Sequence, residues 1–306
     1  MALPLLLAWF SSALAAPPPL SVVSVNAWGV PNVVHPLHSN EGRLHGALGE
    51  YLAEAQRFDV VAVQEVWREM WRPDVRRGDF LADVLGVVPT WIGPVGRGGR
   101  VAPLPRAETG LAFALPGARW TPVSVPEQHP FAARGRSFDG FKHKGFARVV
   151  VRAEAEGAPV EVVVINTHLQ AENLFGAHAD ATVRQAQVLE TLAALTAEAR
   201  PVVWIGDFNL AEGASAAGRV DAATVEAVRA AGFREGADFV PALAASASNV
   251  DGGRYDRVWV RGSAEWGLTV EDAAAHVHGG DPARTSVIKQ LSDHLPLEVT
   301  VAVTRR

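Results

Sequence analysis

The chain has 306 residues, of which 48% are hydrophobic and 20% charged, a balance typical of one large or two small globular domains. Its formal net charge of −5 argues against a passive nucleic-acid-binding protein, because such proteins usually present a basic face. The chain contains no cysteine, so disulfides, thiolate nucleophiles and cysteine-ligated zinc are excluded.

The N-terminal segment has the composition of an export signal. Residues 3–14 are mostly apolar, and Ala13-Leu14-Ala15 has the small-residue spacing of a cleavage site. We therefore predict a signal peptide over residues 1–16 and a protein that is secreted or held in the periplasm or cell envelope. The run is shorter than the about 20 apolar residues that a membrane span needs. No Lys or Arg precedes it, and the alternative is a mis-assigned start codon or a disordered tail.

Short apolar runs recur along the rest of the chain and predict strands. Helical spacing is clearest over residues 44–52 and from Thr182 to Leu195, and an alanine-rich helix is expected from Ala222 to Ala231 before Gly232. The eight predicted strands are Val22–Val25, Val60–Val63, Gly110–Leu115, Phe146–Val151, Val160–Ile165, Val202–Ile205, Tyr255–Val260 and Leu297–Val303.

The predicted strands outnumber the helices between them, which does not fit a simple wheel of alternating strands and helices. Two sheets packed face to face, with helices outside each, account better for the order of elements. We predict an α/β protein with a four-layer α-β-β-α sandwich of mixed, mostly antiparallel sheets. Residues 20–306 are expected to form one domain, because no repeat or long linker divides them.

Several predicted strands end in polar side chains, and polar groups at the ends of rigid strands are a common way to build an active site. Taken singly, each has a structural explanation as a turn residue, a helix cap or a half-buried histidine. The recurrence at separate strands favours a shared site. The residues are Asn26, Glu65, His168, Asp207 and Asn209, with Asp293 and His294 just before the final strand.

The residue types indicate the chemistry of this predicted site. Carboxylates and amide oxygens are hard donors that suit Mg²⁺ or Mn²⁺, whereas zinc is disfavoured because only two histidines are present. His168 and His294 can transfer protons near neutral pH. Asp256 begins a strand from which it could orient His294 and stabilise its charged form.

These residues occur in motifs that resemble the endonuclease/exonuclease/phosphatase superfamily, which includes pancreatic deoxyribonuclease, apurinic endonucleases, inositol phosphatases and neutral sphingomyelinases. The matching motifs stand in family order and span nearly the whole mature chain. They are Asn26, Gln64-Glu65, Asn166-Thr167-His168, Gly206-Asp207-Phe208-Asn209, Tyr255-Asp256 and Ser292-Asp293-His294. The resemblance implies the deoxyribonuclease-like fold.

Within this superfamily the chain looks most like the neutral sphingomyelinase branch. The resemblance lies in segments around the predicted site: Asn26-Ala27-Trp28-Gly29-Val30-Pro31, Glu65-Val66-Trp67, Lys144-Gly145, Thr167-His168-Leu169-Gln170-Ala171-Glu172 and Gly280-Asp281-Pro282. These segments are moderately specific for the branch and weakly specific for the substrate.

The resemblance implies hydrolysis of a phosphodiester by in-line attack of water. Glu65, with help from Asn26 and Asp293, would hold the metal ion. His294, oriented by Asp256, would be the general base.

The remaining candidates would contact the phosphate or the leaving group. His168 would donate a hydrogen bond or a proton, and Asp207 and Asn209 would position water and phosphate. Lys144 would bind the phosphate. The resemblance leaves open which of the two histidines is the acid.

We therefore predict a Mg²⁺- or Mn²⁺-dependent phosphodiester hydrolase that cleaves phospholipid as a sphingomyelinase does and releases the phosphorylated headgroup. A monomer in peripheral contact with a membrane surface, without a stable nucleic-acid partner, fits this interpretation. The alternative is a secreted deoxyribonuclease-like endonuclease on the same fold. A third hypothesis is a non-catalytic member of the superfamily that binds a membrane or a partner protein.

Overall fold

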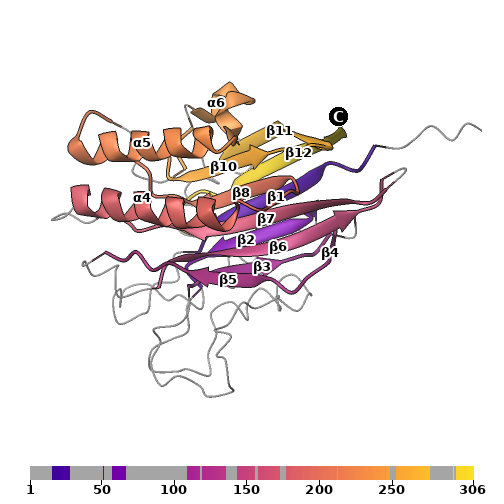
Figure 1. Ribbon diagram of the computed structural model, residues 1–306, viewed down its shortest axis with the longest axis horizontal. Coiled ribbons are helices and arrows are strands. Elements are labelled where there is room, and N and C mark those ends of the chain that lie inside the picture. The colour runs from indigo at the N-terminus through magenta and orange to yellow at the C-terminus, as the bar shows by residue number, and fades with distance from the viewer. Residues whose placement is uncertain are drawn as a thin grey trace, which may run out of the picture.

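The computed structural model of the protein describes a core of two β-sheets packed face to face, with helices against one outer face (Figure 1). The residues described are 16–27, 51, 57–66, 109–117, 119–135, 143–155, 158–172, 177–211, 213–244, 246–248, 253–275, 292 and 294–306.

The first sheet has five strands in the order β11-β12-β1-β2-β3. Only β1 and β2 are parallel neighbours, and the other pairs are antiparallel. The strands are β1 (Leu20–Asn26), β2 (Val60–Gln64), β3 (Ala112–Ala114), β11 (Trp266–Ala275) and β12 (Leu297–Arg305).

The second sheet has seven strands, in the order β4-β6-β7-β8-β10-β9, with β5 also paired to β6. Here β7 and β8 are the parallel pair. The strands are β4 (Thr121–Pro122), β5 (Glu127–Pro130), β6 (Gly145–Ala153), β7 (Val160–His168), β8 (Val202–Asp207), β9 (Arg234–Glu235) and β10 (Asp256–Arg261).

The alternation of side chains along β7 and β8 explains their long apolar runs. Val162 and Val164 face the core between the two sheets, whereas Val163 and Ile165 face the helices. Both faces of these strands are covered, so nearly every position is buried and the runs before their polar ends are mostly apolar.

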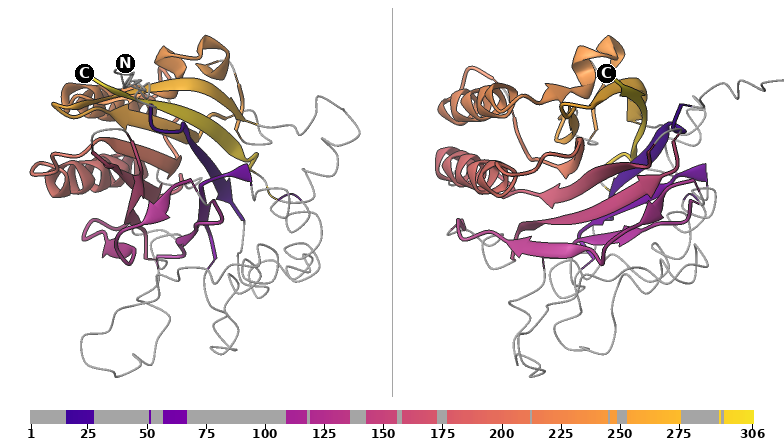
Figure 2. Two further views of the ribbon diagram at one scale, coloured as in Figure 1. Left: turned by 90° about the vertical axis from the view of Figure 1, so that its right-hand side faces the viewer. Right: turned by 45° about the vertical axis from the view of Figure 1, so that its right-hand side comes forward.

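Two helices, α4 (Ala177–Ala194) and α5 (Ala216–Ala230), pack on the outer face of the seven-stranded sheet (Figure 2). The side chain of Ser215 caps α5 by accepting a hydrogen bond from the Gly218 amide at 2.9 Å. Gly232, with φ of +84°, follows the helix as predicted, because glycine adopts this conformation without strain. The 3₁₀ helix η5 (Gly236–Asp238) and the short α6 (Pro241–Ala244) follow.

The predicted architecture of two packed, mixed and mostly antiparallel sheets is confirmed. All eight predicted strands are present, and the sequence interpretation missed β4, β5, β9 and β11. The helix predicted over residues 44–52 lies outside the described residues except for Tyr51, which is helical. No helix in the described part of the chain is long and apolar enough to cross a membrane.

Two predicted helix starts were wrong. Helix α4 begins at Ala177 rather than at Thr182, because the Thr182 hydroxyl bonds to the His178 carbonyl inside the helix instead of capping its end. Helix α5 begins at Ala216 rather than at Ala222, because Ser215 provides the cap.

Candidate active site

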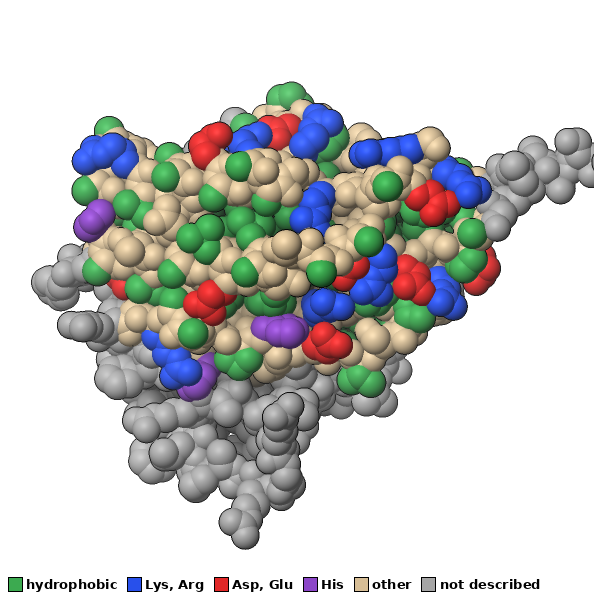
Figure 3. Space-filling model, in the orientation of Figure 1, with side chains coloured by type: hydrophobic (Ala, Val, Ile, Leu, Met, Phe, Trp, Pro, Cys, Tyr) green, Lys and Arg blue, Asp and Glu red, His purple; other side chains and the backbone are tan. Residues whose placement is uncertain are grey.

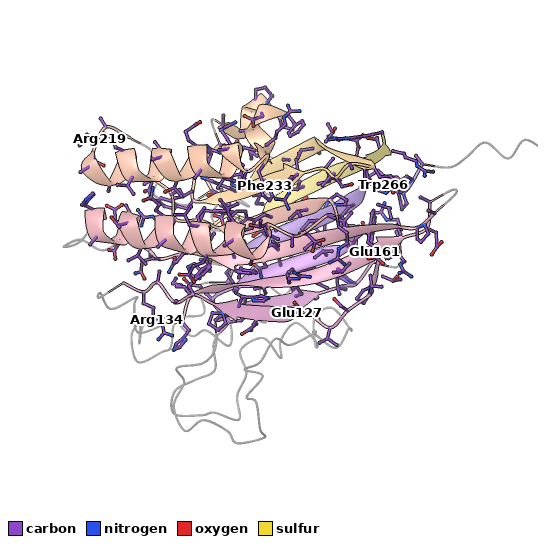
Figure 4. The ribbon with its side chains drawn as sticks, in the orientation of Figure 1. Glu127, Arg134, Glu161, Arg219, Phe233 and Trp266 are labelled. Carbon is purple, nitrogen blue, oxygen red and sulfur yellow. The ribbon has the colours of Figure 1, made fainter. Side chains whose placement is uncertain are left out.

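Strand register places four positions, three of them with polar side chains, in one row across the seven-stranded sheet. Gly145 pairs with His168, His168 with Asp207, and Asp207 with Asp256. Figure 4 shows Glu161 at the end of the sheets opposite Arg134. Glu161 is near the start of β7 and His168 ends it, so the row lies at the end away from Glu161.

Asp207 lies where the two sheets meet at this end. Its Oδ2 accepts a hydrogen bond from Asn26 Nδ2 at 2.9 Å, which joins β8 of one sheet to β1 of the other. His168 Nε2 lies 3.4 Å and His294 Nε2 3.7 Å from the same oxygen. A single carboxylate oxygen therefore has both histidines and an amide around it.

Gly206 is required by the path of the chain before Asp207. Its φ is +142°, and a Cβ at this position would collide with the backbone of Thr167 on the neighbouring strand. The glycine therefore allows β8 to approach β7 closely enough to bring Asp207 beside His168.

His294 and Asp256 form a buried hydrogen-bonded pair. Nδ1 of His294 lies 2.7 Å from Oδ2 of Asp256, and the two side chains are almost fully buried. Because the carboxylate accepts a hydrogen bond from Nδ1–H, this bond fixes the ring so that Nε2 faces Asp207. A histidine held this way presents one nitrogen for proton exchange.

Lys144 contacts the other histidine. Its Nζ lies 2.6 Å from His168 Nε2, and Lys144 is only 3% exposed. The ammonium group has protons only to donate, so Nε2 of His168 accepts in this arrangement. The residue after Lys144 is a glycine, because a side chain at Gly145 would collide with the His129 backbone on β5. The pair places a positive charge inside the site.

Glu65 follows β2 with an unusual backbone conformation. Its φ is +61°, in the left-handed region that side chains other than glycine rarely adopt and that costs about 1–3 kcal/mol. Its Oε1 lies 3.5 Å from Asn26 Nδ2 and 3.7 Å from His168 Nε2. Its Oε2 is buried and has no hydrogen-bond partner among the described residues.

Burial is the main cause that raises the pKa of Asp207, and the negative charge of Asp256 raises it further. The charges of His294 and Lys144 and the hydrogen bond from Asn26 oppose this shift without cancelling it. A carboxyl whose pKa is raised between two histidines is suited to sharing a proton with them.

The donor set fits a hard divalent cation. Glu65 Oε2 is a buried acceptor without a described partner, and the amide of Asn26 lies beside the same carboxylate. A second group, Asp207, Asp256 and His294, has candidate ligand atoms within 4.8 Å of one another. In that group the His294–Asp256 hydrogen bond already uses the facing atoms, so we assign the cation to the Glu65 side.

The structure brings together most of the residues predicted for the site. Asn209 differs, because its Nδ2 donates to the Leu169 carbonyl at 3.2 Å and so ties the loop after β8 to the loop after β7. Its backbone amide donates to Asp207 Oδ1 at 3.0 Å. Asp293 lies outside the described residues. The residues that the structure brings together are Asn26, Glu65, Lys144, His168, Asp207, Asp256 and His294.

A buried amide bridge beneath the site was not predicted. Gln64 Nε2, from the five-stranded sheet, donates to Asn166 Oδ1 of the other sheet at 2.6 Å and to Ser24 Oγ at 3.0 Å. Asn166 Nδ2 donates in turn to the carbonyls of Val63 and Ala112. Both amides were visible in the sequence as strand-end residues, but nothing local indicates that they meet across the sheets.

Ser292 was also assigned no role from the sequence, although it stands in the last motif. Its hydroxyl donates to the Asn26 carbonyl at 2.6 Å and accepts from the His294 amide at 3.1 Å. Ser292 therefore ties His294 to the end of β1.

Residues 23–294 match the model of the Endonuclease/Exonuclease/phosphatase family. The chain belongs to this family. The superfamily prediction is thereby confirmed, and with it the assignment to a class of hydrolases that act on phosphodiester bonds. No curated protein matches the chain.

Solved structures of the family have the same fold. An endonuclease/exonuclease/phosphatase from Beutenbergia cavernae is 18% identical with a TM-score of 0.66, over 94% of this chain and 72% of that one. Sphingomyelinase C from Streptomyces griseocarneus is 23% identical with a TM-score of 0.58, over 92% and 99%. D. rerio TDP2 in complex with single-strand DNA product is 17% identical with a TM-score of 0.58, over 92% and 98%. At these identities the likeness shows the fold alone.

Proposed function

We propose that this family member is a secreted, metal-dependent phosphodiesterase that cleaves sphingomyelin or a related phospholipid and releases the phosphorylated headgroup. The observation that carries the proposal is the convergence of His168, His294 and Asn26 on the Asp207 carboxylate. Asp256 lies behind His294, and Glu65 borders the same space.

His294 is the general base of the proposed reaction. Its Nε2 is the nitrogen that the Asp256 hydrogen bond leaves facing the site, and it takes the proton of the attacking water. Asp256 stabilises the imidazolium ion that forms, because its carboxylate lies 2.7 Å from the protonated Nδ1.

Lys144, His168 and Asn26 form the phosphate side of the site. Each carries nitrogen donors, and the three are buried around the carboxylates of Asp207 and Glu65. Donors fixed in a site of low dielectric stabilise the negative charge that grows on the phosphoryl oxygens. Phosphate would take over the Lys144 hydrogen bond, and His168, in its protonated form, would give the Nε2 proton to the leaving oxygen, which balances the proton that His294 takes from water.

Glu65 and Asn26, with Asp293, would hold a Mg²⁺ or Mn²⁺ ion. When bound, such an ion polarises the phosphoryl oxygen and stabilises charge on the leaving oxygen. The open oxygen of Glu65 supports this assignment.

Three arguments favour a phospholipid over a nucleic acid. The segments that resemble the sphingomyelinase branch include or adjoin site residues in the sequence, and residues 28–31, Trp67 and residues 280–282 lie outside the described part. The net charge is −5. Acidic and basic side chains are mixed on the described part of the face in Figure 3, and no continuous basic band crosses it.

The alternative function is a secreted endonuclease. The structural likeness to a family member in complex with single-strand DNA product supports it. The proposal also includes export through residues 1–16, action as a monomer and peripheral contact with a membrane surface, for which the predicted signal peptide and the lipid substrate are the supporting arguments.

The test offers the chain from Pro17 onward three labelled substrates: sphingomyelin, phosphatidylcholine and plasmid DNA, each with Mg²⁺, Mn²⁺ or EDTA. We expect phosphocholine release with metal, and a loss of about 10²–10⁴-fold in His294→Ala because the general base is gone. His178→Ala is the control, since His178 is exposed on α4. DNA nicking without lipid cleavage would establish the alternative, and full activity of His294→Ala would refute the mechanism.

A further inference from the structure

The His294–Asp256 pair joins segments that come from different sheets. Asp256 is the first residue of β10, whereas His294 precedes β12 in the five-stranded sheet. The two residues are 38 positions apart in the chain. Their 2.7 Å bond requires that something hold the two segments in register.

Ser248 contacts both segments. Its hydroxyl oxygen accepts hydrogen bonds from the amides of Tyr255 at 2.9 Å and Asp256 at 2.8 Å. Its backbone carbonyl accepts from the Leu295 amide at 2.8 Å, and its own amide donates to the Gly253 carbonyl at 2.9 Å. Ser248 is 1% exposed. One buried residue therefore binds the residue that carries the carboxylate and the residue next to the histidine.

We propose that Ser248 is a positioning residue for the proposed hydrolysis and acts through the Asp256–His294 pair. The inference rests on the proposed function, because the pair is the general base of that reaction. Ser248 contacts neither ring nor carboxylate, and its effect on the chemistry runs through the backbone of both segments.

The hydroxyl matters because its oxygen has two lone pairs and both are used by backbone amides. Without that oxygen, the amides of Tyr255 and Asp256 lose their acceptor, and the bond from Asp256 is fully buried. Buried polar groups almost always have a hydrogen-bond partner. The start of β10 must then shift to find other partners. A shift of about 1 Å at such a distance from the chemistry can lower a rate about 10²-fold.

Two further contacts of this loop are made by side chains. Arg254 donates to Glu235 at 2.5 Å, which anchors the loop to β9. The ring centroid of Tyr255 lies 6.2 Å from that of His294. Neither contact involves the Asp256 amide, so neither replaces the hydroxyl of Ser248.

The test measures kcat and KM for sphingomyelin in mixed micelles with Mg²⁺, and for plasmid DNA if the wild type cleaves only that. We expect Ser248→Ala to lower kcat about 10–100-fold, with KM within about threefold of the wild type. Ser246→Ala is the matched control, because the hydroxyl of the half-buried Ser246 donates to the Ala242 carbonyl of α6 and not to either segment of the pair. It should keep full activity.

A shape-matched pair covers the case in which Ser248→Ala folds poorly. Threonine and valine have the same shape, but only threonine keeps the oxygen, so Ser248→Thr should retain more than ten times the kcat of Ser248→Val. Circular dichroism and thermal unfolding of each variant report the fold independently of activity. Equal kcat for the two folded variants would overturn the inference.

A double-mutant cycle with Asp256→Asn separates positioning from a general loss of structure. If Ser248 acts through Asp256, Ser248→Ala should change kcat less than about twofold in the Asp256→Asn background. Fully additive losses, or full activity of Ser248→Ala, would contradict the proposal. An inactive wild type would refute the proposed function instead, and so the two failures are distinguishable.

Discussion

Two buried charged clusters in this protein differ in how their polar atoms are used. One is the pair Arg184–Asp221 between α4 and α5, in which both side chains are 0% exposed. The other is the group of Asp207, Asp256 and His294 at the ends of the sheets. We assign the first to structure and the second to the proposed reaction.

The Arg184–Asp221 pair is satisfied within the protein. The guanidinium donates to both carboxylate oxygens, at 3.0 and 2.8 Å, and to the Gln170 carbonyl at 3.2 Å. Asp221 also accepts from the Ala211 amide at 3.1 Å. The pair thus joins both helices to the loops that follow β7 and β8.

The site leaves acceptors open. Asp256 Oδ1 and Glu65 Oε2 are buried and have no hydrogen-bond partner among the described residues. Such groups are costly in the folded state unless something binds them. Burial alone therefore does not mark a functional charge; in this comparison the open carboxylate oxygens distinguish the site from the structural pair.

Breaking the Arg184–Asp221 pair should have the largest effect on stability. Arg184→Met leaves the Asp221 carboxylate buried without its partner, and we expect the free energy of unfolding to fall by about 3–5 kcal/mol. Urea unfolding measures it. The double variant Arg184→Met/Asp221→Leu should recover part of the loss, because it removes the unpaired charge. A single variant within about 1 kcal/mol of the wild type would break the comparison.

Asp207→Asn should do the opposite. We expect activity to fall about 10²–10³-fold, because the carboxylate around which the donors converge is lost. Thermal stability should be unchanged or higher. Burial penalises the charged carboxylate and so raises its pKa, and a neutral amide does not carry this cost. If the melting temperature fell together with activity, Asp207 would be a structural residue, as Arg184 and Asp221 are.

The open acceptor on Glu65 predicts stabilisation by metal. Mg²⁺ or Mn²⁺ at about 100 times its dissociation constant should raise the free energy of unfolding by about 2.7 kcal/mol, and EDTA should reverse this. Glu65→Ala should abolish the shift, whereas Glu271→Gln, an exposed carboxylate on β11, should keep it. Thermal unfolding with and without metal gives the answer, and a shift that survives in Glu65→Ala would move the ion elsewhere.

Glu198, far from both clusters, gives the smallest effect. Hydrogen bonds from Arg200 are the main cause that holds the pKa of Glu198 below its ordinary value of 4.5, although burial opposes them. This carboxylate therefore stabilises the fold above pH 4.5, and the stabilisation is lost as pH falls through its lowered pKa. Glu198→Gln should flatten the acid decline of melting temperature without changing activity. Glu226→Gln, on the exposed side of α5, should leave the curve unchanged.

Apolar runs were sufficient to predict the central strands and the polar residues at their ends, because strands buried on both faces are continuous in sequence. Strand β11 was missed for a local reason. Trp266, Leu268 and Val270 alternate toward the core, but an irregularity between Val270 and Asp272 interrupts the pattern.

The Arg184–Asp221 pair and Ser248 could not be predicted for a different reason. Arginine and aspartate are mostly exposed in proteins, so a charged residue in a helix is first assigned to the surface. Arg184 is nevertheless on the buried face of α4 with Gln187 and Val188. That burial is favourable only because two helices and two loops meet around the side chain. These contacts join residues far apart in the sequence, so local patterns do not reveal them.

The bridge between Gln64 and Asn166 has a consequence for how the two sheets are aligned. Apolar faces attract without direction, so a core of valines would tolerate several offsets of one sheet over the other. The 2.6 Å hydrogen bond between the two fully buried amides can form at one offset and is lost at the others. The core alone would accept several alignments, and the two amides select one of them. That alignment brings the site residues at the ends of β1 and β2 next to those at the ends of β7 and β8.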